Sequence, residues 1–144
     1  MQLREMEGKE IAAFLGHFTL HFPERDLEED KNCRVLLLEA LEGQPLATVA
    51  PGKLSEATCK GIREQVVSIV NKVHAKNIYF PVLYLDKFLL LSTSPELRLF
   101  GFSNSFNPWD VYTTREKCLD HAELTLAEVE GLLEDYGFGG GGVA

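Results

Sequence analysis

The sequence predicts a single α+β domain in which an antiparallel sheet of five to six strands packs against a long crossover helix and a C-terminal helix pair. The strongest observation is a run of apolar residues at helical spacing over residues 55–75. Three short apolar segments follow it, and their connections are short enough to require antiparallel pairing. A length of 144 residues fits one domain with one hydrophobic core.

The N-terminal third predicts one short helix and up to three strands. Residues 8–15 place apolar side chains at helical spacing, whereas residues 17–22 alternate apolar and polar side chains as a strand does. The sequence leaves open whether residues 17–22 join the sheet or extend the helix. The continuous apolar run within residues 33–41 is typical of a strand buried on both faces. Residues 45–50 predict a weaker strand at a sheet edge, because they begin with proline.

The remaining elements are predicted from capping and turn residues. Ser55 is a plausible N-cap for the long helix. Strands are expected over 78–85, 88–92 and 97–103, with a Ser-Pro turn between the last two. Two capping-box patterns, Thr113 with Glu116 and Thr125 with Glu128, predict two C-terminal helices.

This order of elements resembles the profilin, longin and roadblock architectures. The resemblance is one of layout, and it implies a single sheet crossed by the long helix. If residues 17–22 form a strand, the layout moves toward small secretion-chaperone folds. Residues 1–136 are expected to form one globular domain, and residues 137–144 a flexible glycine-rich tail.

Composition limits the compartment and the partners. The formal charge is −8, with a pI of about 5.0 and no stripe of Lys and Arg, which argues against nucleic acid and anionic membrane surfaces. The sequence has no apolar run long enough to span a membrane and no secretory signal at its start. Three widely spaced cysteines suit a reducing compartment. These observations predict an acidic cytoplasmic protein.

An aromatic stretch near the end of the predicted sheet is the candidate partner-binding surface. Its residues are Phe100, Phe102, Phe106, Trp109 and Tyr112. If helices cover both faces of the sheet, the phenylalanines are core residues. If one face is open, the five form an apolar patch of the kind that marks interfaces. For the tryptophan, a plug at the sheet-to-helix junction and an interface anchor both remain open.

A second pattern suggests a metal site. His17 and His21 would share one face of a strand, and Cys118 and His121 one face of a helix. Together they could form a tetrahedral Cys-His₃ zinc site. The alternative places the two strand histidines on a solvated surface and Cys118 in the core.

The sequence therefore favours a non-catalytic, cytoplasmic protein-binding module without a cofactor. It would act as an adaptor, chaperone or inhibitor of another protein, alone or as a homodimer, and the acids of 24–30 would steer a basic partner. The alternative is a zinc-binding protein or small metalloenzyme. No nucleotide-binding or hydrolase motif stands in a suitable context, since the glycine run at the C-terminus has no helix after it.

Overall fold

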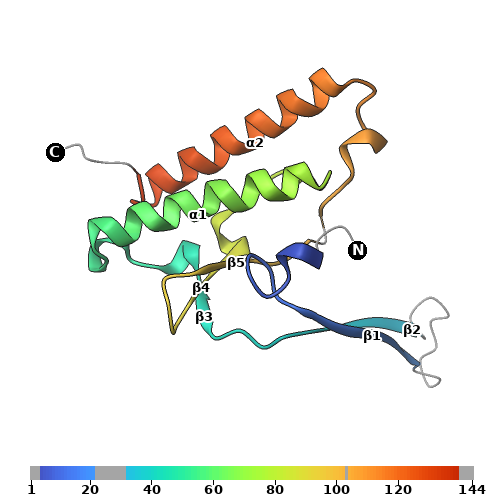
Figure 1. Ribbon diagram of the computed structural model, residues 1–144, viewed down its shortest axis with the longest axis horizontal. Helices are drawn as coiled ribbons and strands as arrows, with labels where there is room; N and C mark the ends of the chain where they lie inside the picture. Colours follow the sequence, from blue (N-terminus) through green and yellow to red (C-terminus); the bar gives the residue numbers. More distant parts are fainter. Residues whose placement is uncertain (1–3, 22–31, 103, 140–144) are drawn as a thin grey trace.

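The computed structural model describes residues 4–21, 32–102 and 104–139. Two long helices lie side by side above a small sheet, and a separate ribbon of two strands projects away from this body (Figure 1). The helices are α1 (Glu56–Ala75) and α2 (Arg115–Asp135), and the strands are β1 (Phe14–His21), β2 (Asn32–Leu38), β3 (Gly43–Pro45), β4 (Phe88–Leu91) and β5 (Leu97–Leu99). Short 3₁₀ turns are η1 (Arg4–Met6), η3 (Leu46–Thr48), η4 (Pro51–Lys53), η5 (Leu85–Lys87) and η6 (Pro108–Asp110).

The α+β class is confirmed, but the strands are divided between two antiparallel sheets. Strands β3, β4 and β5 form one sheet of three strands, and β1 pairs with β2 alone. The single sheet of five to six strands, and with it the profilin, longin or roadblock layout, is not formed by the described segments. Residues 78–85 do not supply the expected strand, because Pro81 has no N–H to donate to a ladder. They make only an isolated bridge, between Tyr79 and Phe106.

The N-terminal predictions are corrected in three places. Residues 8–15 form no helix, and β1 instead begins at Phe14, so residues 17–21 are strand. Residues 45–50 are mostly the η3 turn and its flanks, because Leu46 is directed into the core and not along a sheet edge. Strand β2 exists as predicted, but its leucines are exposed and not buried on both faces.

Helix α1 confirms the strongest prediction. The Ser55 side chain accepts a hydrogen bond of 3.1 Å from the Thr58 backbone N–H, which caps the helix as expected. Its apolar stripe is fully buried and consists of Ile62, Val66, Ile69, Val70 and Val73.

One helix, α2, replaces the predicted C-terminal pair. Thr114, and not Thr113, caps it by accepting from the Lys117 N–H. Thr125, the second expected cap, is buried in the middle of the helix. The buried face continues through Thr125 into Val129 and Leu133. Packing of this continuous face keeps the segment helical where a local capping signal would end it.

The C-terminus of α2 ends in a Schellman motif. Gly137 has φ of +92°, the Gly137 N–H donates to Glu134 O (3.0 Å), and the Phe138 N–H donates to Leu133 O (2.7 Å). Phe138 is 0% exposed and belongs to the hydrophobic core. The packed body thus includes Phe138, which was predicted to belong to the tail of residues 137–144. Residues 140–144 lie outside the described part of the chain. No helix within that part is long and apolar enough to cross a membrane.

Candidate functional site

The predicted aromatic residues fall into three environments. The first is a cluster of rings in which Phe106 and Tyr112 contact His121. The Tyr112 hydroxyl lies 2.8 Å from His121 Nδ1, and His121 Nε2 lies 2.9 Å from the Phe80 carbonyl oxygen. A carbonyl can only accept, so Nε2 carries the hydrogen and, in the neutral ring, Nδ1 accepts from the tyrosine. His121 therefore links three chain segments.

We expect Tyr112→Phe to lower the free energy of unfolding by about 1 kcal/mol, because it removes the partner of a partly buried imidazole nitrogen. Urea denaturation would measure the loss. Tyr84→Phe is the matched control, since Tyr84 is exposed on the surface. Equal stability of the two variants would show that the Tyr112–His121 bond contributes nothing.

The second environment is an exposed turn that holds Trp109. Asn107 caps it by accepting from the Trp109 N–H at 2.9 Å, and Pro108 is buried beneath it. Trp109 itself is 51% exposed. The plug at this junction is therefore Pro108, and Trp109 is available at the surface.

The third environment is an apolar groove of about 510 Å³ between the end of β5 and the base of the ribbon. Phe100 and Phe102 line it, and Phe102 also packs on Phe80 with ring centroids 5.7 Å apart. Leu36 and Leu38 of β2 line the opposite side. The groove therefore combines the predicted phenylalanines with ribbon leucines that the sequence analysis placed in a core.

The ribbon extends this apolar surface beyond the groove. Its register pairs Phe18 with Val35 and Leu20 with Cys33 on one face, while His17 pairs with Leu36 on the other. Both faces present large apolar side chains to solvent, namely Leu15, Phe18, Leu20, Leu36, Leu37 and Leu38. We call these six residues the ribbon patch. In the sequence, this surface is marked by four consecutive apolar residues in β2. Such a run predicts a strand buried on both faces only where other elements cover both faces.

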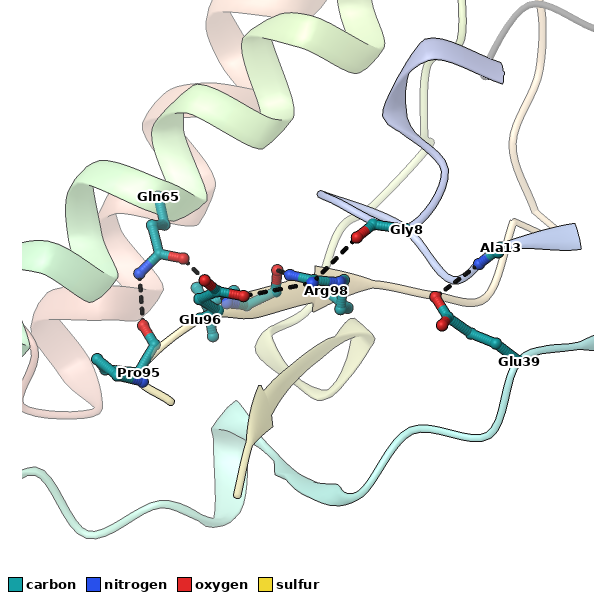
Figure 2. A network of polar contacts seen from close by, with 8 residues as sticks. Gly8, Ala13, Glu39, Gln65, Pro95, Glu96 and Arg98 are labelled. Carbon is teal, nitrogen blue, oxygen red and sulfur yellow. Dashed lines mark hydrogen bonds and ion pairs between the residues drawn. The ribbon is translucent and has the colours of Figure 1, made fainter. Parts of the chain in front are cut away.

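Polar contacts fasten the N-terminal segment to β5 and close the base of the ribbon (Figure 2). Arg98 of β5 donates to Gly8 O at 3.2 Å and pairs with Glu96 at 3.3 Å. At the base of the ribbon, the Ala13 N–H donates to Glu39 Oε1 at 2.8 Å. The Ala13–Glu39 contact joins the two ends of the ribbon to each other, and the apolar side chains of the ribbon patch remain exposed.

The predicted zinc ligands are not brought together. His17 and His21 lie on β1 in the ribbon, whereas Cys118 and His121 lie on α2. Within residues 4–21, 32–102 and 104–139, no three or more His, Cys, Asp or Glu side chains are grouped as a metal site requires. Cys118 is buried, and both ring nitrogens of His121 already have protein partners. The described residues therefore do not form the predicted Cys-His₃ group.

His74, which the sequence analysis left unassigned, lies at the end of α1 beside Tyr79, with ring centroids 4.7 Å apart. Its Nε2 is buried and has no hydrogen-bond partner. Burial, followed by the nearby His121, lowers the pKa of His74 from 6.5 to about 4. Burial also raises the pKa of Tyr79, with a further contribution from Cys118. His74 is therefore neutral at pH 7.

Acid should destabilise the fold through His74. The unfolded chain takes up this proton below about pH 6.5 and the folded chain only near pH 4, so stability falls as pH falls through that window. The shift corresponds to at most roughly 3 kcal/mol, and partial solvent access reduces the expected loss to about 1–2 kcal/mol. Urea denaturation at pH 7.5 and 4.5 would measure it. His74→Gln should lose less stability than the wild type over this interval, and an identical loss would contradict the assignment.

Comparison with known proteins shows a likeness in fold alone. No protein-family model and no curated protein sequence matches the chain. Solved structures do match, 423 chains in all. One is the kinase PK-1 of Cydia pomonella granulovirus, with a TM-score of 0.57 and 17% sequence identity over 74% of this chain. The chain spans 36% of the length of that kinase. The likeness is therefore one of fold, to part of that structure.

Proposed function

We propose that this domain is a non-catalytic protein-binding module whose partner packs on the ribbon patch and the adjoining groove. One observation carries the proposal: large apolar side chains cover both faces of a two-stranded ribbon that packs chiefly on itself. An isolated two-stranded hairpin is marginally stable in water. The ribbon is therefore stabilised when another chain covers its apolar side chains. Contiguous apolar surface of this kind is typical of protein interaction sites.

The occupant that we propose is an extended apolar segment of a different protein, added at a ribbon edge. Such segments gain affinity from backbone hydrogen bonds and specificity from alternate side chains. Phe100 and Phe102, which line the groove, would contact apolar side chains of this segment at the base of the ribbon. A formal charge of −8 opposes pairing of two copies and favours a basic partner. An adaptor, chaperone or inhibitor in the cytoplasm is the setting that we propose for this activity.

The likeness to part of a kinase does not decide whether the domain is catalytic, because the chain spans only 36% of that kinase. Protein kinases place a catalytic base in an H-R-D triplet and a metal ligand in a D-F-G triplet. This sequence contains neither triplet. The glycine run from Gly137 has the spacing of a phosphate-binding loop, but Gly137 ends helix α2 and Phe138 is buried beneath it. A phosphate loop precedes a helix, and this run follows one.

Ribbon substitution tests the proposal. Leu36→Lys places a charge on the ribbon patch, and Leu124→Lys makes the same change at an exposed leucine of α2. Proteins captured by the wild-type domain would be identified by mass spectrometry, and each would be purified and titrated by calorimetry. We expect at least a tenfold weaker Kd for Leu36→Lys and no change for Leu124→Lys, because a buried unpaired charge opposes association.

Two results would overturn this assignment. Equal binding by wild type and Leu36→Lys would place the partner elsewhere on the surface. A dimer in sedimentation equilibrium that Leu36→Lys dissociates would make a second copy the occupant of the patch.

A further inference from the structure

Strand β2 leaves its outer edge open. Every residue of Asn32–Leu38 pairs with β1, and no hydrogen bond joins the main chain of this strand to any described segment outside the ribbon. An edge strand of this kind presents a row of N–H and C=O groups to which another extended chain can pair. A third strand would also stabilise the ribbon, because three strands with an apolar face are stable where an isolated pair is marginal.

The outer edge of β1 is less suited to such an addition. The register shifts between Phe14 and Gly16, so Leu15 is an extra residue that has no partner on β2. A bulge of this kind bends its strand and interrupts the hydrogen-bond ladder, and natural edge strands carry bulges that prevent pairing with another chain. The edge of the ribbon that accepts a straight strand is therefore that of β2.

The two faces of β2 determine which side chains an added strand must carry. Side chains alternate between the two faces of a strand. The side chains on the first face are all apolar, namely Cys33, Val35 and Leu37. On the second face, Leu36 and Leu38 line the groove, and Arg34 is the one charged residue in the strand. An added strand places its side chains beside these, so it needs apolar residues at all positions except the one opposite Arg34.

Arg34 selects the charge at that position. Its side chain is exposed, and it forms no ion pair with a described residue. Opposite charges on neighbouring strands attract, whereas like charges directly opposite each other are destabilising. An acidic side chain opposite Arg34 is therefore favoured. The requirement is local, and the net charge of −8 still favours a partner that is basic outside this segment.

We propose that the extended segment of the partner adds at the outer edge of β2 and runs antiparallel to it, with an acidic side chain opposite Arg34 and apolar side chains at its other positions. The antiparallel direction is favoured because it is the more stable per residue. The side chains opposite Leu36 and Leu38 lie on the groove side of the ribbon. This inference rests on the proposed function, since it names the edge, direction and charge of the segment that packs on the ribbon.

Cys33 can report where a segment adds, because it is exposed and belongs to β2. The probe is the peptide Leu-Val-Leu-Val-Glu-Cys-Lys-Lys. Antiparallel pairing places its glutamate opposite Arg34 and its cysteine opposite Cys33. The peptide cysteine is supplied as a mixed disulfide with thionitrobenzoate. The Cys33 thiolate attacks the peptide sulfur, a protein–peptide disulfide forms, and thionitrobenzoate leaves as a coloured thiolate whose absorbance gives the rate.

We expect this peptide to react with the full chain about tenfold faster than Cys-Glu-Val-Leu-Val-Leu-Lys-Lys, which has the same composition in reversed order, because pairing holds the two sulfurs together. Cys33→Ser gives the background from the other cysteines. Arg34→Glu should slow the reaction, and a peptide with lysine in place of glutamate should restore it. Each rate is divided by the rate with hydroxyethyl disulfide, a small neutral reagent, to remove differences in thiol reactivity. Equal rates for the two peptides, or no effect of charge reversal, would overturn the proposal.

The same reaction tests the other edge. Leu20→Cys combined with Cys33→Ser moves the thiol to the residue of β1 that pairs with Cys33. A strand beside β2 cannot react there, because a disulfide needs Cα atoms within about 7 Å and alternate strands lie about 9–10 Å apart. A faster reaction of either peptide with this double variant than with the wild type would overturn addition at β2 and leave the ribbon as the site. The proposed function itself fails only if a captured partner binds Leu36→Lys as tightly as the wild type.

Discussion

Replacing Phe138 with alanine should lower the free energy of unfolding by about 3–5 kcal/mol, the usual cost of deleting a buried phenylalanine ring. The ring is 0% exposed and packs in the main core. Its backbone also closes the end of α2 and accepts a hydrogen bond of 2.9 Å from Arg63. Urea denaturation of the purified domain would measure the effect.

The matched control is Phe18→Ala, which removes the same ring from an exposed position on the ribbon and should cost much less. Ending the chain after Gly139 should preserve stability, whereas ending it after Gly137 should reproduce the loss. If Phe138→Ala were as mild as Phe18→Ala, the last turn of α2 would not be part of the cooperative core.

Gly43→Ala should cost about 3 kcal/mol or more, at the upper end of the overpacking range. A Cβ atom at this position would lie 2.2 Å from the Leu90 carbonyl oxygen and 2.9 Å from its carbon. Both atoms belong to the backbone of β4, so no side chain can move aside. The β3–β4 pairing would have to separate, and thermal denaturation followed by circular dichroism would report the lower Tm.

Gly61→Ala is the opposite case. Gly61 lies within α1 and a Cβ there meets no atom within 4 Å, so alanine should raise stability by about 0.5–1 kcal/mol through its helix propensity. A stabilising effect of both alanines would contradict the close approach at Gly43. A loss at both would show that neither glycine tolerates a side chain.

The elements predicted correctly depend on neighbouring residues in the sequence. Helix α1 has its cap and its whole apolar stripe within twenty-one consecutive residues, so the pattern alone identifies it. The wrong predictions concern strands whose pairing partners lie far away in the sequence. Alternating apolar residues identify a strand but not its partner, so the separation of β1 and β2 from the other strands could not be predicted. Thr125 shows a local capping signal overridden by packing against α1.

The candidate sites were predicted in part. Phe100 and Phe102 do line a groove, but its other wall is the ribbon, more than 60 residues earlier in the chain, and no local pattern shows that contact. His74 carried a signal that went unused. It follows Val70 by four residues and so lies beside the buried stripe of α1. A histidine at such a position is expected to be partly buried, and its Nε2 is indeed buried without a hydrogen-bond partner.

The ribbon has a consequence for the dynamics of the chain. Because β1 and β2 pair mainly with each other, their amide hydrogens can exchange with solvent through a local opening that leaves the helices intact. The amides of α1, packed at the centre of the core, should exchange only through global unfolding. A bound partner would then be visible first as slower deuterium uptake in β1 and β2, with the exchange of α1 nearly unchanged.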